Sequence, residues 1–416
     1  MDRHDAGTVC GDSMQLTSCK KTYNNETQRA SPLDATLARI EPLVPAAGIT
    51  RVADITNLDR IGIPVFSCIR PTAMDGAITV YNGKGATVEE SRISAIMEGI
   101  ERYSSEMHDR RLPMANYQEM FARGRTIDPR DLIVPEGFDP DRPIAWYEGF
   151  DIVNNEQVFV PAHAVFHPLP PHHRGPFRTN TNGLASGNTF EEAVFHALAE
   201  VIERDAWSLV ESSRDTGPAI TGMDDPAIAG MLEKFAKAQV EVTVRDITSD
   251  IGIPTIAAVA DDVLLKDPLL LTIGIGTHTS ARIAVMRALT EVAQSRLTQI
   301  HGAREDTVLA EMRKKIGYDR AKRINGYWFR DNGTEDYKNL TSSDTDDFKK
   351  DIENIIAALD KQGLDRVIIV DLTREEIGMP VVRVIVPGLE VWAMDRERRG
   401  ERADNAADHR LSRTES

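Results

Sequence analysis

TVEESRISAIMEGIER at residues 87–102 recurs in the same frame as TFEEAVFHALAEVIER at residues 189–204. Steps of four and three residues place Ser94, Glu98 and Glu101 on one face of a helix. The second copy puts His196, Glu200 and Glu203 at the matching positions, as the repeat requires. Each row runs beside an apolar stripe. We therefore predict two helices that each present a pair of carboxylates at the edge of a buried core.

A third helix with the same spacing is predicted farther along the chain. It runs from Ser280 to about Gly302, and it carries Arg287, Glu291 and Gln294 in the same steps of four and three. Apolar residues flank this row in the same register as in the first helix. Three helices of one pattern indicate that the chain repeats a single structural unit.

A second repeat lies between the helices, in segments 54–64, 246–254 and 371–380. Each segment begins with Asp-x-Thr, continues through a short polar loop and ends in Gly-x-Pro. An apolar strand precedes each loop and another follows the proline, which is tolerated as the first residue of a strand. The even distribution of both repeats predicts one large, interlocked α+β domain.

The ends of the chain differ from this central part. Residues 1–30 are polar and mostly aperiodic, so we expect a flexible N-terminal arm before a domain that spans 31–392. Residues 393–416 mix charges of both signs with almost no apolar side chains. That composition is typical of a disordered tail.

The composition excludes several classes of protein. The chain has 416 residues, of which 41% are hydrophobic and 27% charged, and its formal net charge is −16. An acidic chain of this kind is not expected to bind nucleic acid through its overall field. No apolar run approaches the roughly 18 residues of a membrane span, and the N-terminal stretch lacks the apolar core of a signal peptide. We therefore expect a cytoplasmic protein with no membrane or nucleic-acid partner.

Cysteine and histidine offer little support for a metal centre of the zinc type. The three cysteines have no CxxC spacing, so neither a zinc site nor a disulfide framework is indicated. His163, His167, His172 and His173 crowd a proline-rich loop but lack an HExxH pattern. His196 differs because it faces the acidic row of its helix.

The acidic rows allow two interpretations. A single Glu-x-x-Glu-Arg is common on solvated helix faces, where arginine screens glutamate. Two copies in frame, each bordering an apolar stripe, favour convergence of the carboxylates in one cleft. Such carboxylates repel one another unless a cation lies between them. Mg²⁺ is the natural candidate because it takes oxygen ligands and completes its shell with water and phosphates.

Glycine-rich stretches precede all three helices, at 82–85, 182–188 and 274–278. A loop that leads into a helix N-terminus exposes unpaired N–H groups and suits a phosphate, and Lys84 adds a positive charge. The alternative is that these are turn glycines before helix caps, with Glu90 and Glu192 completing capping boxes. No GxxxxGK[ST] motif is present. The combined pattern favours phosphoryl transfer outside the P-loop and protein-kinase families.

At these residues the sequence resembles the YcaO family. The motifs are Ser94-x3-Glu98-x2-Glu101-Arg102, TNGLASGNTFEEAVFHALAEVIERDAW at 181–207 and ALTEVAQSR at 288–296. The likeness runs from about residue 30 to 392. More narrowly, GITRVADITNLDRIGIPVFSCIRP, GKGATVEESRISAIMEGIERYSSE and GMPVVRVIVPGLEVW are similar to the methanogenesis-marker branch. That branch converts a glycine in the α subunit of methyl-coenzyme M reductase to thioglycine.

The resemblance implies a YcaO-type domain around a nucleotide site and ATP-dependent activation of a backbone amide. The amide oxygen takes the γ-phosphoryl group, a sulfur nucleophile adds to the carbon, and phosphate leaves. By motif position, the Mg²⁺ ligands would be Glu98, Glu101, Glu200 and Glu203. The nucleotide contacts would be Lys84, Ser94, Asn188, Glu192, His196, Arg204, Gln294 and Arg296.

The same resemblance leaves two alternatives and suggests partners. Azoline-forming YcaO cyclodehydratases usually end in a proline-rich segment, whereas the last proline here is Pro387, so a thioamide former is favoured over a cyclodehydratase. A catalytically silent nucleotide-binding scaffold is the other alternative. Thioamide formers of the family often work with a TfuA-type partner and a sulfide source, and a homodimer is possible in this family.

Overall fold

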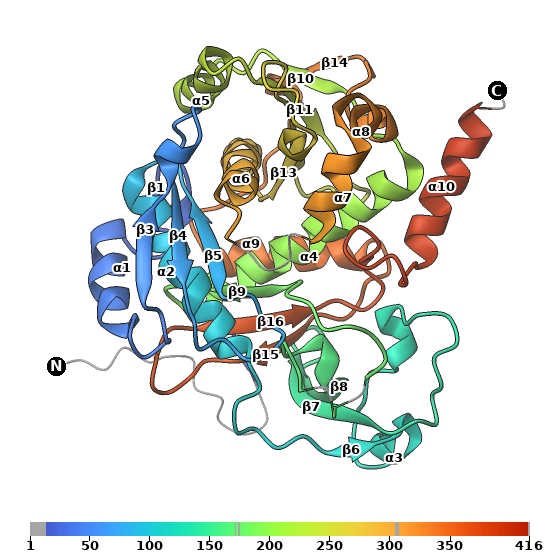
Figure 1. The fold of residues 1–416 in the computed structure, drawn as a ribbon. Coiled ribbons are helices and arrows are strands. Elements are labelled where there is room, and N and C mark those ends of the chain that lie inside the picture. The colour runs from blue at the N-terminus through green and yellow to red at the C-terminus, as the bar shows by residue number, and fades with distance from the viewer. Residues whose placement is uncertain (1–13, 171, 174, 304–307, 415–416) are drawn as a thin grey trace.

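The computed structural model describes residues 14–170, 172–173, 175–303 and 308–414. Within these residues the strands form four sheets, and helices pack between and around them (Figure 1). The helices are α1 (Leu33–Ile40), α2 (Val88–Ser105), α3 (Tyr117–Phe121), α4 (Phe190–Ser213), α5 (Pro226–Lys237), α6 (Ala281–His301), α7 (Val308–Ile316), α8 (Tyr318–Ile324), α9 (Phe348–Asp360) and α10 (Glu401–Thr414). No helix in the described part of the chain is both long enough and apolar enough to cross a membrane.

Two large sheets and two small ones make up the strand content of these residues. A two-stranded sheet pairs β1 (Tyr23–Asn24) with β2 (Gln28–Arg29). A three-stranded sheet contains β3 (Arg51–Asp54), β4 (Val65–Ile69) and β5 (Val80–Lys84). A five-stranded sheet has the order β13 (Thr272–Thr277), β12 (Thr255–Asp261), β11 (Glu241–Asp246), β10 (Ala219–Thr221) and β14 (Thr334–Asp336). The six-stranded sheet has the order β6 (Met114–Ala115), β7 (Ile144–Asp151), β15 (Ile368–Asp371), β16 (Val381–Ile385) and β9 (Leu184–Ser186), with β8 (Glu156–Pro161) also on β7.

The two sequence repeats combine into a three-strand-and-helix unit that occurs three times. Antiparallel β3, β4 and β5 lead into α2, and antiparallel β11, β12 and β13 lead into α6. In the third unit, β15 pairs with β16, β16 pairs with β9, and β9 leads into α4. This arrangement confirms the predicted α+β domain of strand–loop–strand units and acidic-faced helices.

Local hydrogen bonds explain why each Asp-x-Thr segment turns. The Asp side chain accepts from the Thr N–H two residues later, at 2.9 Å for Thr56, 2.9 Å for Thr248 and 2.8 Å for Thr373. The Thr hydroxyl oxygen then accepts from the first N–H of the outgoing strand at 3.0 to 3.2 Å. The glycine two residues before each proline has a positive φ, between +64° and +77°. Glycine adopts such a backbone conformation more readily than other residues.

The helix boundaries follow their caps. The Thr87 side chain accepts from Glu90 N, and the Glu90 side chain bonds back, so α2 begins with the predicted capping box. Thr189 caps α4 in the same way, but Glu192 does not complete the box. Helix α6 ends at Gly302, which has a φ of +61°. The third predicted helix is therefore confirmed at both ends.

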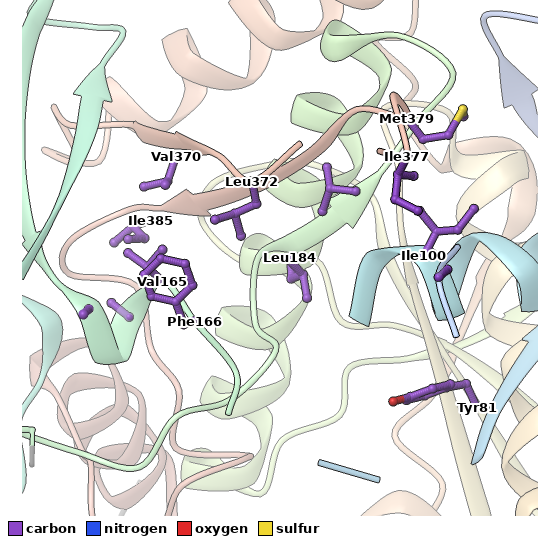
Figure 2. Close-up of a cluster of buried hydrophobic side chains, with 14 of the residues drawn as sticks. Tyr81, Ile100, Val165, Phe166, Leu184, Val370, Leu372, Ile377, Met379 and Ile385 are labelled. Carbon is purple, nitrogen blue, oxygen red and sulfur yellow. The ribbon is translucent and has the colours of Figure 1, made fainter. Parts of the chain in front are cut away.

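The largest apolar cluster joins the first unit to the six-stranded sheet. Figure 2 shows Ile377, from the loop between β15 and β16, next to Ile100 of α2, and Leu184 of β9 and Leu372 belong to the same cluster. Phe166, which is fully buried, approaches the same sheet from the loop that follows β8. Burial of this surface holds α2 against β9 and fixes the direction of its acidic row.

The glycine-rich stretches before α2 and α6 are strands rather than phosphate-binding loops. Gly83 lies in β5, and Gly274 and Gly276 lie in β13, where their backbones join the antiparallel ladders. Their role is to let a helix lie directly on the strand. A Cβ on Gly83 would sit 2.0 Å from Ala95 N, and one on Gly276 would sit 2.3 Å from Ala284 O. The prediction of flexible phosphate loops at these two places is wrong because helix packing uses the glycines.

Replacing Gly83 with alanine is expected to destabilise the fold by about 3 kcal/mol, since a buried clash with backbone atoms cannot relax by a change of rotamer. The measurement is the free energy of unfolding in urea. Gly230→Ala in α5 is the matched control, because a Cβ there meets open space. The control is expected to stabilise by about 0.5–1 kcal/mol. Equal stability of both variants would contradict the packing role.

The N-terminal arm is more ordered than the sequence indicates. Residues 1–13 lie outside the described residues, but 14–30 run along α4 and α9. Thr17 N donates to Glu191 at 2.8 Å, Cys19 N donates to Asp347 at 3.0 Å, and buried Lys21 pairs with Asp351 at 2.5 Å. These contacts satisfy polar groups of the arm that the composition alone suggests would be hydrated.

The structure places a helix in the segment for which the sequence predicts a disordered tail. Residues 401–414 form α10, which packs along α4 (Figure 1). Arg402 pairs with buried Asp205 at 2.8 Å, and the Glu390 carboxylate accepts from Gly400 N and Ala403 N at the start of the helix. The charges that suggest a solvated segment find partners on α4 and in the preceding loop.

Candidate functional site

A cavity of about 320 Å³ lies where α2, α4 and α6 converge. Every predicted site residue except Arg296 lines this cavity. These residues are Lys84, Ser94, Glu98, Glu101, Asn188, Glu192, His196, Glu200, Glu203, Arg204 and Gln294. Residues far apart in the sequence therefore meet in one place, as the repeated rows predict.

The last residue of each row forms a hydrogen bond to a strand of a neighbouring unit. Glu101 of α2 accepts from Ser186 N of β9 at 3.1 Å, and Glu203 of α4 accepts from Thr277 N of β13 at 3.0 Å. Gln294 of α6 donates through its amide to the Asn82 carbonyl of β5. The three bonds run from α2 to β9, from α4 to β13 and from α6 to β5, so they close a ring around the cavity. A carboxylate could not make the third bond, because a carbonyl needs a donor.

The inner carboxylates have raised pKa values. Burial raises the pKa of Glu101 to about 8, against the opposing charge of Arg102. Burial, followed by the charge of Glu291, raises the pKa of Glu203 to about 7. These carboxyl groups resist ionisation in the protein alone, and a cation bound beside them would favour the charged form.

The cavity also presents donors suited to an anion. Among the described residues, Arg102 Nη1, Arg204 Nε and Arg287 Nε are buried and have no hydrogen-bond partner. Arg102 Nη2 reaches Glu98 at 3.3 Å, and Nη1 lies 3.6 Å from Glu101, within ion-pair distance but without a hydrogen bond. Buried N–H groups without partners are rare in proteins, and guanidinium groups match phosphate oxygens. A nucleotide phosphate chain therefore fits the donors that the protein leaves free.

The acidic set fits Mg²⁺ rather than a metal enclosed by protein ligands. No three His, Cys, Asp or Glu side chains of the described residues already converge tightly enough to hold a metal ion. Mg²⁺ usually binds through one or two carboxylates and takes its other ligands from water and phosphate. Four glutamates that line the cavity can supply such carboxylates, and they share it with the arginines described above. They are Glu98, Glu101, Glu200 and Glu203.

Lys84 lies in the cavity, but its ammonium group is already paired with Glu291 of α6. Burial acts to raise the pKa of Glu291, but Lys84 and Arg204 outweigh it and hold the pKa below its ordinary value. Ser94 is oriented from the same strand, because its hydroxyl accepts from Lys84 N at 3.3 Å. Lys84 thus balances the acidic residue that the third helix adds.

The N-terminal arm closes the opposite end of the cavity. Ala30 N donates to Glu192 at 3.0 Å, and Arg29 Nη1 donates to His196 Nε2 at 2.6 Å. Burial, followed by the charge of Arg29, holds the pKa of His196 well below its ordinary value, so the ring is neutral and accepts. Asn188 donates to Glu192 at 3.1 Å and accepts from Thr36 at 2.8 Å. These three predicted site residues form a bonded wall that the arm holds in place.

Arg296 is the one predicted site residue that does not line the cavity in the described structure, so its nucleotide contact stays a prediction. Its side chain is fully buried and pairs with Asp59 at 2.8 Å and with Asp262 at 3.0 Å. Arg296 is two residues after Gln294 in α6, so the two side chains lie on different faces of the helix. The ion pairs join α6 to the loops after β3 and β12 and leave the cavity untouched.

The sequence prediction omitted several cavity residues, namely Arg29, Arg102, Arg287 and Glu291. Arg287 and Glu291 occupy the positions of Ser94 and Glu98 in the third copy of the row, so the spacing could have identified them. Arg102 stands in the quoted motif. Arg29 carries no such signal, because it belongs to the arm outside the repeats.

A family model described as YcaO cyclodehydratase, ATP- and Mg²⁺-binding, matches residues 82–390. This chain belongs to the YcaO family. The expected cofactors, ATP and Mg²⁺, are those of the family description. The cavity just described lies within the matched YcaO residues, apart from the part that the arm and α1 contribute.

Individual relatives agree with this assignment. An uncharacterized protein of Methanothermobacter thermautotrophicus is 52% identical over 362 residues, which cover 85% of this chain and 93% of the relative. A Rhizobium leguminosarum bv. trifolii protein, described as lying in the tfuA 3' region, is 32% identical over 93% of this chain and 94% of its own length. The structure of YcaO from Methanopyrus kandleri bound with AMPPCP and Mg²⁺ superposes with a TM-score of 0.78 at 30% identity, covering 92% of this chain and 98% of that one. The shared fold confirms the predicted YcaO-type domain.

Proposed function

We propose that this YcaO protein uses ATP and Mg²⁺ to convert a peptide backbone amide into a thioamide, forming thioglycine in the α subunit of methyl-coenzyme M reductase. The observation that carries the nucleotide chemistry is the cavity that the four predicted metal-binding glutamates line together with Arg102, Arg204 and Arg287, each of which has a buried N–H group without a hydrogen-bond partner in the described residues. The 52% identity to a methanogen protein supports the substrate.

The residues divide into those that hold the cation and those that hold the phosphates. Glu98 and Glu101 on α2, with Glu200 and Glu203 on α4, would hold Mg²⁺ from two sides. Three arginines would donate to phosphate oxygens through N–H groups that lack hydrogen-bond partners in the described residues: Arg204, Arg102 and Arg287. Lys84 would balance the charge of Glu291 on α6. The remaining predicted residues would line the nucleotide: Ser94, Asn188, Glu192, His196 and Gln294.

Bound Mg-ATP supplies the phosphoryl group that makes an amide oxygen a good leaving group, which resonance in the peptide bond otherwise prevents. The protein contributes position and charge. Its carboxylates are fixed by backbone N–H groups of neighbouring strands, and its guanidinium groups are held beside them, so little reorganisation is needed at the moment of transfer. No side chain of the cavity needs to act as the nucleophile.

A second protein is proposed to deliver the sulfur. The relative from the tfuA 3' region, which matches nearly the full length of this chain, supports a TfuA-type partner together with a sulfide source.

An azoline-forming cyclodehydratase is the alternative, and the family description favours it. The two reactions share amide activation and differ in the nucleophile. A cyclodehydratase uses a neighbouring Cys, Ser or Thr side chain and removes water, whereas a thioamide former exchanges oxygen for sulfur.

Peptide mass spectrometry on the reductase α subunit tests the proposal. Cells that lack this gene are expected to carry plain glycine where the parent carries thioglycine, and restoring the gene should restore the modification. Intact thioglycine in the deletion strain would contradict the assigned substrate. A reaction of the purified protein with a peptide whose target carbonyl carries heavy oxygen tests amide activation independently of the product. The label should appear in the released phosphate in both the thioamide and the azoline reaction.

A further inference from the structure

A second, smaller cavity of about 50 Å³ adjoins the site on the side of the six-stranded sheet. It lies between β16, α4 and the loops around residues 177–182 and 386–398. Two arginines line it, Arg383 with 3% and Arg398 with 4% of its surface exposed. No ion pair to either arginine is found within the described residues. Two buried charges that form no direct ion pair are costly.

The N–H groups of these arginines are only partly satisfied. Arg383 donates to the Asn180 carbonyl at 2.9 Å and to the Asn180 side chain at 3.1 Å, while its Nε has no partner among the described residues. Arg398 donates to the carbonyls of Ile133 at 2.7 Å and Leu132 at 2.5 Å. Carbonyl oxygens accept hydrogen bonds from the guanidinium groups, but because they carry no net charge they do not neutralise the two positive charges. Asn182 adds a buried acceptor oxygen that also lacks a partner in the described structure.

The remaining walls are apolar. Phe177, Leu132 and Val391 line the cavity, and the Arg398 guanidinium lies 3.8 Å from the centre of the Phe177 ring. Burial lowers the pKa of Arg383 to about 9 and that of Arg398 to about 10. A small anion that is weakly hydrated suits a pocket with two arginines and apolar walls.

The small cavity lies next to the catalytic one. Arg383 of β16 is directly opposite Leu184 of β9, and side chains of directly opposed residues lie on the same face of a sheet. Leu184 lines the large cavity, and Arg383 lines the small one. Val201 of the small cavity follows Glu200 of the large one in α4. Glu200 is also the carboxylate that acts most strongly on Arg383 across this boundary.

We propose that the Arg383–Arg398 cavity binds hydrosulfide, the sulfur nucleophile of the reaction; this inference rests on the proposed function. Hydrosulfide is small, carries one negative charge and has a polarisable sulfur that tolerates apolar walls. Its lone pairs accept from Arg383 Nε–H, and its S–H donates to the Asn182 oxygen. A phosphate group, with four oxygens to satisfy, matches this pair of unpartnered atoms poorly.

The step balances without a redox reagent. The sulfur forms a bond to the carbon of the phosphorylated amide, and the bond from that carbon to oxygen breaks as phosphate leaves with its electron pair. The S–H proton passes to solvent, and the product holds a carbon–sulfur double bond. A hydrosulfide held by Arg383 lies at the boundary between the two cavities, because Arg383 is directly opposite Leu184 of the large cavity.

Kinetics with sodium sulfide as donor and a glycine-containing peptide of the α subunit as acceptor test the role of Arg383. Arg383→Gln is expected to raise the KM for sulfide roughly ten- to hundredfold, the usual worth of a charged hydrogen bond, with little change in the KM for ATP. Arg383→Lys should recover part of the loss. Arg245→Gln is the matched control, because Arg245 is also buried and bonded to carbonyls but lies in the five-stranded sheet. An unchanged KM for sulfide in Arg383→Gln would overturn the proposal.

Anion binding without turnover provides an independent readout. Crystals of the parent soaked in bromide should show an anomalous peak within hydrogen-bond distance of Arg383 Nε, and added sulfide should lower its occupancy. Arg383→Gln crystals should lack the peak. Water alone in the cavity, or an adventitious ion only that sulfide does not displace, would overturn the site. A displaceable peak in a protein that forms no thioamide would instead uphold the anion site and refute the proposed function.

Discussion

Replacing Glu101 or Glu203 with glutamine is expected to lower ATP turnover at least about hundredfold, because each change removes a charge that would stabilise Mg²⁺ and the transferred phosphoryl group. Glutamine keeps the size of glutamate, and its carbonyl oxygen can still accept from Ser186 N or Thr277 N, which hold the two carboxylates at 3.1 and 3.0 Å. The fold should therefore survive. The measurements are phosphate release at saturating peptide and the Mg²⁺ dependence of nucleotide binding.

Glu89→Gln is the control for this prediction. Glu89 lies in the first turn of α2 and is exposed, so its loss removes the same charge from the same helix without touching the cavity. Its turnover should match the parent. If Glu101→Gln and Glu203→Gln also turn over ATP like the parent, the acidic rows are ordinary helix faces and the metal assignment fails.

Replacing Arg296 with methionine is expected to destabilise the protein by about 3–5 kcal/mol, because it leaves the buried Asp59 carboxylate without its counter-charge. Arg296 is fully buried, and it pairs with Asp59 and Asp262, of which Asp262 retains Arg60 at 2.7 Å. Asp59 would lose its buried partner. Urea denaturation measures the loss, and the KM for ATP of the remaining folded protein should equal that of the parent.

Arg92→Met is the comparison for Arg296. Arg92 pairs with Glu41 at 2.6 Å, but both side chains are more than two-fifths exposed. Exposed pairs contribute about 0–1 kcal/mol, so this variant should be nearly as stable as the parent. An Arg296→Met protein of parental stability with a raised KM for ATP would restore the nucleotide contact suggested by the motif.

The acidic site could be predicted from sequence to an unusual degree. A row of residues at steps of four and three must lie on one helix face, whatever the helix packs against. Because the row borders the apolar stripe, burial of that stripe carries Glu98 and Glu101 to the edge of the core. The same reasoning applied to the third helix would have added Arg287 and Glu291.

Other residues could not be assigned in this way. Arg296 stands in a motif of the family, yet whether it faces nucleotide or carboxylates depends on Asp59 and Asp262, which are remote in the chain. Gly83 looks like part of a flexible loop until α2 is seen to lie on its strand. Arg29 reaches His196 only because the arm is fastened along α4 and α9.

The sequence alone determined the local elements: the capped helices, the Asp-x-Thr turns and the three rows of polar residues at steps of four and three. These depend on hydrogen bonds and periodicities within a few residues, which a linear pattern records. Only the tertiary structure decided how the units close into a ring, which charges are buried in pairs, and that the charged tail forms a helix on α4. Those outcomes depend on partners that folding brings together from distant segments, since the cost of burying a charge is set by what lies opposite it.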